Sequence, residues 1–183
     1  MWKKILKELL GTGLYLLGVL LAALFIVTFI VQRTTVDGQS MEPTLQNNDN
    51  LFVDKVSYRF RDPQRFEVIV LRPFANQKDI LYIKRIIALP GETIQIELDG
   101  TILINGEKLA DPYGMEVIKP ENIGRAIEPI TLGENEYFVM GDNRNNSGDS
   151  RNKQVGNISR SQIIGRAWIR IWPLNKWGRV NKK

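Results

Sequence analysis

Two residue types are missing altogether from the 183-residue sequence, which contains no histidine and no cysteine. Without histidine the chain can form neither a Ser-His-Asp triad nor an imidazole zinc site. Without cysteine it can form no disulfide, no thiolate metal site and no cysteine nucleophile. If the chain catalyses hydrolysis, its general base must therefore be a carboxylate, a lysine, a tyrosine or an amine.

The excess of positive charge is modest and evenly spread. The formal net charge is +5 and the sequence pI is about 9.5. No run of lysine and arginine reaches the density that is typical of a nucleic-acid-binding arm. The charge therefore favours proximity to anionic lipid, and nucleic acid is not an expected partner.

One long uncharged segment stands near the N-terminus, at residues 9–31. At ~1.5 Å rise per residue, a helix of this length spans the ~30 Å hydrocarbon core of a bilayer. The segment is longer than the ~7–15 apolar residues of a cleaved signal peptide, and no small-x-small cleavage site follows it. We predict an uncleaved transmembrane anchor over 9–31.

The charges that flank this anchor predict its orientation. Three lysines precede it, and only Arg33 follows it closely. The positive-inside rule therefore places residues 1–8 in the cytoplasm and the chain from about residue 32 onward outside. Because no later segment is apolar enough to span again, we expect a single-pass protein of the plasma membrane with its soluble part on the extracytoplasmic side.

The soluble part has the patterns of β structure. Residues 67–71 hold a continuous apolar run with β-branched side chains, typical of a strand buried on both faces, and residues 80–89 form another long strand candidate. Alternating runs around residues 93–104 are followed by Asp99-Gly100 and Asn105-Gly106, dipeptides favoured in hairpin turns. Further strands are expected at residues 136–140 and 166–172. The prediction is a mostly β fold behind one helix.

The first segment with chemical potential is 37–45, a few residues beyond the anchor. Gly38 permits backbone conformations that are closed to other residues, and Pro43 restricts the backbone where the segment ends. A serine held between them, Ser40, could expose its hydroxyl beside free backbone N–H groups, as acyl transfer requires. Taken alone, the segment is more simply interpreted as an ordinary turn after a membrane helix.

The second segment contains Lys84 within an apolar stripe. Side chains two apart in a strand share a face, so Lys84 is expected to lie with Tyr82 and Ile86. Such a lysine either extends its ammonium to water or is desolvated, and desolvation lowers its pKa from ~10.4 by up to several units. A desolvated Lys84 would be neutral often enough near pH 7 to act as a base; a lysine that reaches water at the strand edge is the alternative.

The third segment, 141–151, combines glycines, amides, hydroxyls and charges of both signs. A polar surface loop is one interpretation, and a metal site at Asp142 and Asp149 is another. The spacing does not match the twelve-residue calcium loop, and four basic or amide positions intervene. No metal is therefore expected.

Together the three segments resemble the ordered motif set of type I signal peptidases, in peptidase family S26. The motifs are Ser-Met-x-Pro-Thr-Leu at 40–45, Lys-Arg-Ile-Ile-Ala-Leu-Pro-Gly-Glu at 84–92, and Gly-Asp-Asn-Arg-x-Asn-Ser-x-Asp-Ser-Arg at 141–151. Residues 65–73 also resemble the family's intervening segment, and the resemblance runs from the anchor to about residue 172. It implies a membrane-bound serine endopeptidase that removes N-terminal signal peptides from exported preproteins with a Ser-Lys dyad.

The resemblance also implies roles for individual residues. Ser40 matches the nucleophile, Lys84 the general base, and Ser147 the residue whose hydroxyl orients the lysine by a hydrogen bond. Gly38 stands where some members carry a serine that donates to the oxyanion, and in this it resembles the Gram-positive members. The backbone N–H of Ser40 is expected to supply one oxyanion donor, and the reaction needs no cofactor.

Four further positions resemble supporting residues of the family: Arg85 and Asp142 as an ion pair, and Asp149 and Arg151 as scaffold. The implied fold is a catalytic β domain over 32–93 and 135–183, interrupted by a small β-hairpin and loop region at 94–134. Preproteins and membrane lipid are the implied partners.

Two other functions fit the same sequence. One is a processing or assembly factor dedicated to a narrow set of clients, and the other is a non-catalytic anchored domain that binds exported chains. The alternating face of Trp168, Arg170 and Trp172 suits the headgroup region of a membrane, although cation–π packing on an ordinary surface explains it equally well.

Overall fold

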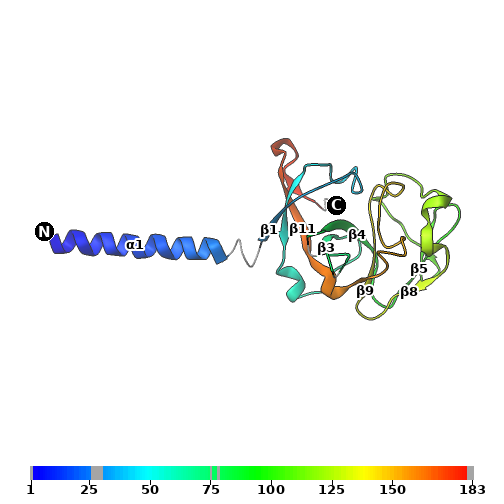
Figure 1. The fold of residues 1–183 in the computed structure, drawn as a ribbon, viewed down its shortest axis with the longest axis horizontal. Helices are drawn as coiled ribbons and strands as arrows, with labels where there is room; N and C mark the ends of the chain where they lie inside the picture. Colours follow the sequence, from blue (N-terminus) through cyan, green and yellow to red (C-terminus); the bar gives the residue numbers. More distant parts are fainter. Residues whose placement is uncertain (1, 26–30, 75, 78, 181–183) are drawn as a thin grey trace.

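The computed structural model describes residues 2–25, 31–74, 76–77 and 79–180. It begins with one α-helix, α1 (Trp2–Phe25), which is drawn in blue ahead of the β domain (Figure 1). The side chains of residues 2–24 are exposed, and the helix is long and apolar enough to cross a membrane. The predicted N-terminal apolar helix is confirmed, and it fits a single-pass membrane anchor.

The helix differs from the predicted anchor at both ends. It already includes residues 2–8, because the lysines, glutamate and leucines of this segment are good helix formers. The last residue of the predicted anchor, Val31, instead opens a strand. Residues 26–30 of the predicted anchor lie outside the described residues.

The remainder is mostly β, as predicted, and most of its strands belong to one large sheet. The strand order is β1-β2-β11-β3-β4-β9-β10, with β12 paired to β11. The strands are β1 (Val31–Thr35), β2 (Asn50–Asp54), β3 (Val68–Leu71), β4 (Tyr82–Ala88), β9 (Glu136–Met140), β10 (Ile158–Ser159), β11 (Ile163–Trp172) and β12 (Gly178–Arg179).

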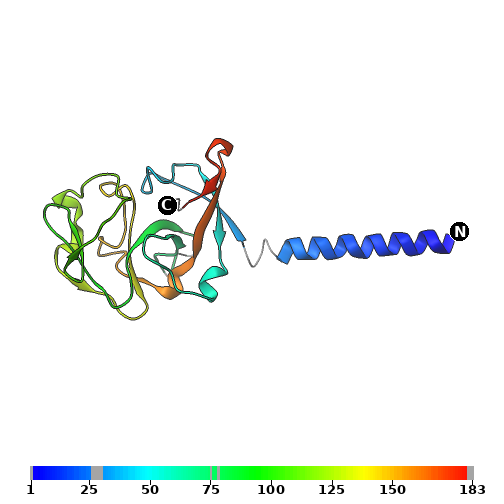
Figure 2. The same cartoon turned by 180° about the vertical axis from the view of Figure 1, so that it is seen from behind.

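A second, four-stranded sheet has the order β7-β6-β5-β8. Its strands are β5 (Thr93–Ile96), β6 (Ile102–Ile104), β7 (Glu107–Lys108) and β8 (Ile130–Thr131). It contributes Ile94 and Ile104 to a buried cluster that also contains Phe138 and Met140 of β9. The inserted segment, green to yellow in Figure 2, therefore packs onto the large sheet through an apolar core.

Short 3-10 helices occupy several connections: η2 (Ser57–Arg59), η3 (Pro120–Asn122), η4 (Gly124–Ile127), η5 (Arg160–Gln162) and η6 (Leu174–Lys176). The β6–β7 turn at Asn105 and Gly106 has φ angles of 53° and 83°. Positive φ at both central residues is the requirement of a type I′ hairpin turn, which explains the Asn-Gly pair.

Strand β4 is central to the large sheet but is not paired along its whole length on both sides. Its residues from Tyr82 to Arg85 pair with β3, whereas pairing with β9 begins only at Arg85 within the described chain. The segment from Tyr82 to Lys84 therefore keeps one edge free of strand pairing. This edge faces the cleft described below.

Candidate active site

The segment that carries Ser40 is a turn held at both ends by apolar side chains. Val36 and Met41 are buried in an apolar cluster that includes Leu51 of β2 and Val68 of β3, and Ser40, between them in sequence, is half-buried. Gly38 has a φ of 88°, and its N–H donates to Asn47 Oδ1 at 2.9 Å. A side chain at Gly38 would meet no neighbouring atom, so the glycine is required by backbone conformation and not by space.

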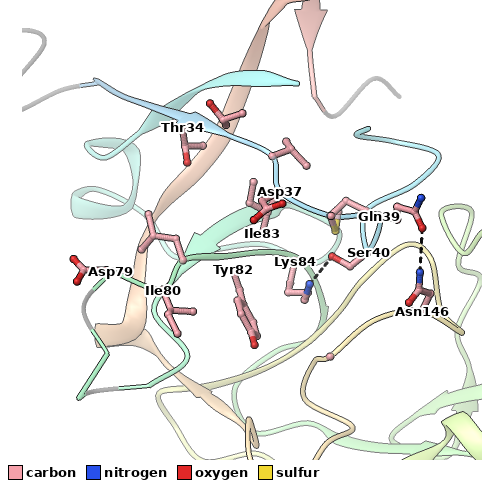
Figure 3. A pocket seen from close by; sticks show the side chains of 16 residues that line it. Thr34, Asp37, Gln39, Ser40, Asp79, Ile80, Tyr82, Ile83, Lys84 and Asn146 are labelled. Carbon is pink, nitrogen blue, oxygen red and sulfur yellow. Dashed lines mark hydrogen bonds between the residues drawn. The ribbon is translucent and has the colours of Figure 1, made fainter. Parts of the chain in front are cut away.

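The side chain of Lys84 reaches Ser40 from the opposite wall. Its Nζ donates to Ser40 Oγ at 2.7 Å (Figure 3). Lys84 is only 5% exposed, and burial lowers its pKa from the usual 10.5 to about 8. The charges of Asp149 and Asp142 oppose this shift in pKa, and that of Arg151 adds to it. At pH 7 about one Lys84 in ten is then neutral, far more than for a lysine in water.

Ser147 does not make the hydrogen bond to Lys84 that the family resemblance implied. Its Oγ is buried and has no hydrogen-bond partner among the described residues. Lys84 Nζ is instead turned to Ser40 and lies 5.2 Å from the centre of the Tyr82 ring. A side chain added at Gly141 would overlap both Ser147 Oγ and the Ser40 carbonyl, so Ser147 lies beside the backbone of the nucleophile turn.

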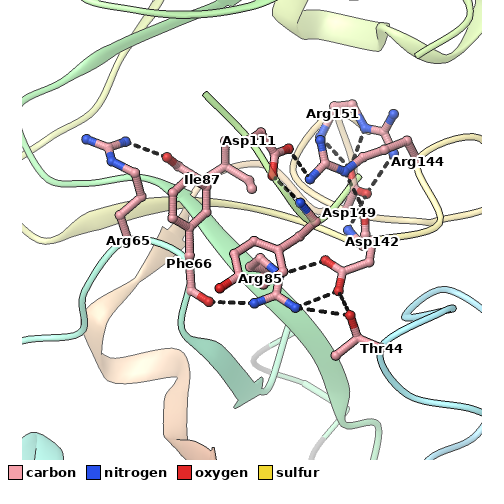
Figure 4. Close-up of polar contacts among 12 residues, drawn as sticks. Thr44, Arg65, Phe66, Arg85, Ile87, Asp111, Asp142, Arg144, Asp149 and Arg151 are labelled. Carbon is pink, nitrogen blue, oxygen red and sulfur yellow. Dashed lines mark hydrogen bonds and ion pairs between the residues drawn. The ribbon is translucent and has the colours of Figure 1, made fainter. Parts of the chain in front are cut away.

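Arg85 and Asp142 form a fully buried ion pair next to this site. Arg85 donates from Nε to Asp142 Oδ1 at 2.7 Å and from Nη2 to Asp142 Oδ2 at 2.6 Å (Figure 4). Thr44 Oγ1 donates to the same carboxylate at 2.5 Å, and the Tyr113 ring lies 3.7 Å from the guanidinium. The pair thus joins β4, the segment after Ser40 and the 141–151 loop.

A second ion pair shapes the 141–151 loop from within. Arg151 donates from Nε and Nη2 to the two oxygens of Asp149, both at 2.8 Å. Asp149 Oδ2 also accepts the Gly141 N–H at 3.1 Å, and Arg151 Nη1 donates to the Asn122 carbonyl in the inserted region at 2.9 Å. The two carboxylates that the metal-binding alternative required are each paired with an arginine.

A cleft of about 790 Å³ lies beside the Ser40–Lys84 pair. One wall is formed by residues 34–41 and the other by residues 79–84, and Asn146 and Gly148 also line the cleft (Figure 3). Strand residues contribute to both walls, Thr34 and Thr35 of β1 to one and Tyr82 to Lys84 of β4 to the other, and the β4 wall has the free strand edge. An extended peptide can add to such an edge by backbone hydrogen bonds, with alternate side chains directed into the cleft.

The model of the family described as signal peptidase, peptidase S26, matches residues 9–172. The chain belongs to this family. The resemblance predicted from the three motifs is thereby confirmed.

Curated relatives of this signal peptidase chain match along most of their length. A signal peptidase I from Leptolyngbya laminosa is 40% identical, covering 86% of this chain and 77% of the relative. Signal peptidase I S of Bacillus subtilis is 37% identical, covering 87% of this chain and 86% of the relative. A probable signal peptidase I-2 of Synechocystis is 36% identical, covering 92% of this chain and 76% of the relative. A crystal structure of a signal peptidase I from Enterococcus faecalis is 34% identical, with a TM-score of 0.46, covering 58% of this chain and 97% of that one.

Three residues of this signal peptidase site were not singled out from the sequence: Thr44, Tyr113 and Asn143. Thr44 and Asn143 lie inside the quoted motifs, which was the available signal, but the motif gave them no role. Tyr113 lies in the segment expected to be loop and carried no signal at all. Asn143 bonds twice to the turn that holds Ser40, from its N–H to the Ser40 carbonyl at 3.1 Å and from Nδ2 to the Gln39 carbonyl at 3.2 Å.

Proposed function

We propose that the chain is a membrane-anchored serine endopeptidase that removes N-terminal signal peptides from exported preproteins, with Ser40 as nucleophile and Lys84 as general base. The observation that carries this proposal is the 2.7 Å hydrogen bond between a half-exposed serine and a buried lysine at the wall of a peptide-sized cleft. Because burial lowers the pKa of Lys84 to about 8, the neutral form that the reaction needs is populated near neutral pH.

The mechanism follows from these two side chains. Neutral Lys84 accepts the Ser40 proton while Oγ attacks the scissile carbonyl carbon, and the carbonyl oxygen becomes an oxyanion. The Ser40 N–H donates to that oxyanion. Lys84 then gives its proton to the leaving amine, and the C–N bond breaks. Lys84 then deprotonates a water molecule, whose oxygen attacks the ester carbon. The bond from this carbon to Ser40 Oγ breaks, Lys84 returns the proton to Oγ, and the signal peptide leaves with a free carboxyl group.

Proximity to the bilayer supports the choice of substrate. Ser40 is nine residues beyond Val31, where β1 begins, so an extended chain places it at most ~30 Å from that point. A signal peptide offers its cleavage bond just past an apolar segment, at a similar depth. The family resemblance implies small residues at the −1 and −3 positions, whose side chains share one side of an extended peptide.

Orientation and lipid contact belong to the same proposal. The lysines before the anchor favour a cytoplasmic N-terminus, with the β domain on the extracytoplasmic side. The C-terminal hairpin bears Trp168, Trp172, Leu174 and Trp177, all exposed, on the segment that also carries Arg170. Tryptophan beside arginine is suited to the headgroup region. A blue shift of tryptophan fluorescence with anionic vesicles, retained in high salt, is expected.

The test is cleavage of purified preproteins by the detergent-solubilised full chain, with the product N-terminus read by mass spectrometry. Wild type is expected to cut after a small residue, and Ser40→Ala and Lys84→Ala are expected to be inactive. Ser161→Ala and Lys153→Ala, both at exposed positions, serve as matched controls and retain activity. Cleavage by Ser40→Ala at the wild-type rate would refute the dyad.

The same assay separates the two other functions. A dedicated processing factor would cut one client and leave several unrelated preproteins intact. A non-catalytic binding domain would cut none, and its binding of exported chains would be unchanged by Ser40→Ala. Several preproteins cut at their signal peptide junctions would exclude both.

A further inference from the structure

One residue of the 141–151 loop, Asn143, bonds two consecutive carbonyl groups of the nucleophile turn, one through its backbone N–H and the other through its side chain. Asn143 is almost fully buried, its N–H donates to the Ser40 carbonyl at 3.1 Å, and its Nδ2 donates to the Gln39 carbonyl at 3.2 Å. The two partners are about a hundred residues apart in sequence. These bonds therefore fix how the turn sits against the catalytic loop, not only how the turn itself is shaped.

The bond to the Gln39 carbonyl has a consequence for the next N–H. The Gln39 C=O and the Ser40 N–H belong to one peptide unit, which is planar and trans, so they point in opposite directions. When Asn143 holds the carbonyl towards its own loop, it directs the Ser40 N–H away from that loop. Among the described residues this N–H has no hydrogen-bond partner, and Ser40 lines the cleft.

Neighbouring groups do not replace this arrangement. The Gln39 carbonyl also accepts the Glu42 N–H at 3.1 Å, but that bond closes the turn locally and leaves its orientation open. Gly38 has no side-chain donor, and its N–H is already bonded to Asn47. The oxyanion at this site thus depends heavily on the direction of the Ser40 N–H.

We propose that Asn143 is a positioning residue that directs the Ser40 N–H at the oxyanion formed during peptide cleavage. The proposal rests on the proposed function, because it requires Ser40 to be the nucleophile. Asn143 bonds to the Ser40 and Gln39 carbonyls and not to Ser40 Oγ or Lys84 Nζ, so it acts through the Gln39–Ser40 peptide unit. A purely structural role would instead lower stability without a selective effect on the transition state.

The experiment compares Asn143→Ala and Asn143→Leu with wild type in the full detergent-solubilised chain. Asn145→Ala is the control, because among the described residues the Asn145 side chain bonds to the backbone of Val117 and Lys119 and to Asn122, and not to the nucleophile turn. The measurements are kcat and KM on a signal peptide substrate, the inhibition constant of a peptide aldehyde that forms a tetrahedral adduct with Ser40, and the melting temperature. If Asn143→Ala is unfolded at the assay temperature, the result for Asn143→Leu decides the test, because leucine is similar in size to asparagine and lacks the donor.

In both Asn143 variants we expect kcat to fall about tenfold and KM to stay within about twofold of the wild-type value. A misdirected donor stabilises the oxyanion of the transition state less, whereas the bound substrate depends little on it. Aldehyde affinity should fall by a similar factor, and the pH at half-maximal kcat/KM should not move. Unchanged kcat and aldehyde affinity, or an equal loss of kcat in Asn145→Ala, would overturn the proposal. If Ser40→Ala remained active, the proposed function itself would have failed; an inactive Ser40→Ala beside fully active Asn143 variants would reject this inference alone.

Discussion

Replacing Lys84 by methionine is expected to abolish cleavage and, at neutral pH, to make the protein more stable. Lys84 is buried, it forms no salt bridge with any described residue, and its hydrogen bond is to the neutral hydroxyl of Ser40. Its charged form is therefore disfavoured in the folded protein relative to the unfolded chain. Methionine has a similar length and no charge to desolvate.

The size of the effect follows from the pKa. Burial lowers the pKa of Lys84 from 10.5 to about 8. Above pH 10.5 the lysine is neutral in both states and costs nothing. As the pH falls below 10.5 the unfolded chain takes up the proton first, which favours unfolding, and below about pH 8 the loss of stability is complete. At ~1.4 kcal/mol per pKa unit the loss amounts to about 3 kcal/mol.

The hydrogen bond lost in Lys84→Met offsets about 1 kcal/mol, so a net gain of about 2 kcal/mol is expected at pH 7. For a domain of this size that corresponds to a melting temperature higher by roughly 4–8 °C. The measurement is thermal unfolding at pH 7 and again near pH 11, where the gain should be replaced by a loss of about 1 kcal/mol from the missing hydrogen bond. Lys153→Met, at an exposed position, controls for removing one positive charge. An equal drop in melting temperature at both pH values would refute the reasoning.

Three further predictions use the same protein. Wild-type kcat/KM should rise with pH through an apparent pKa near 8, because the neutral form of Lys84 is the active one, and a flat profile between about pH 7 and 9 would contradict this. Gly141→Ala should lower kcat/KM at least about tenfold, because the added methyl group would overlap the Ser40 carbonyl oxygen and Ser147 Oγ. Gly133→Ala, whose methyl group would make only ordinary contacts, should leave kcat/KM unchanged. Asp142→Asn removes the charge that pairs with buried Arg85 and should cost about 3–5 kcal/mol in urea unfolding; a loss below about 1 kcal/mol would be inconsistent with the ion pair.

The parts of the fold that the sequence predicted best are those with a strong local pattern. Strands β3 and β4 lie within the apolar runs at 67–71 and 80–89, and the predicted hairpin turns contain the Asp-Gly and Asn-Gly pairs. Strand β1 was not predicted, because Val31 was assigned to the anchor and the other four residues of the strand are polar. Its partner β2 has only five residues, too few for the alternation of Leu51 and Val53 to stand out.

The site divides in the same way. Ser40 and Lys84 belong to motifs whose residue types are tied to one chemistry, and the structure brings them within hydrogen-bond distance. The hydrogen bond expected of Ser147 depends on a single side-chain rotamer, which no pattern of residue types encodes. Asn143 acts on backbone carbonyls, and these are present at every residue. Its partners therefore become visible only when the loop and the turn are seen together.

The adjacent residues Lys84 and Arg85 place the base and the buried ion pair on opposite faces of one strand. Neighbouring residues of a strand point to opposite faces, so β4 directs Lys84 into the cleft and Arg85 into the buried pair with Asp142. A lysine acts as an efficient base near neutral pH where burial destabilises its charged form. The bidentate pair of Arg85 with Asp142 ties β4 to the loop from which Asn143 bonds to the nucleophile turn. One strand therefore sets both the proton acceptor and, through that loop, the direction of the oxyanion donor.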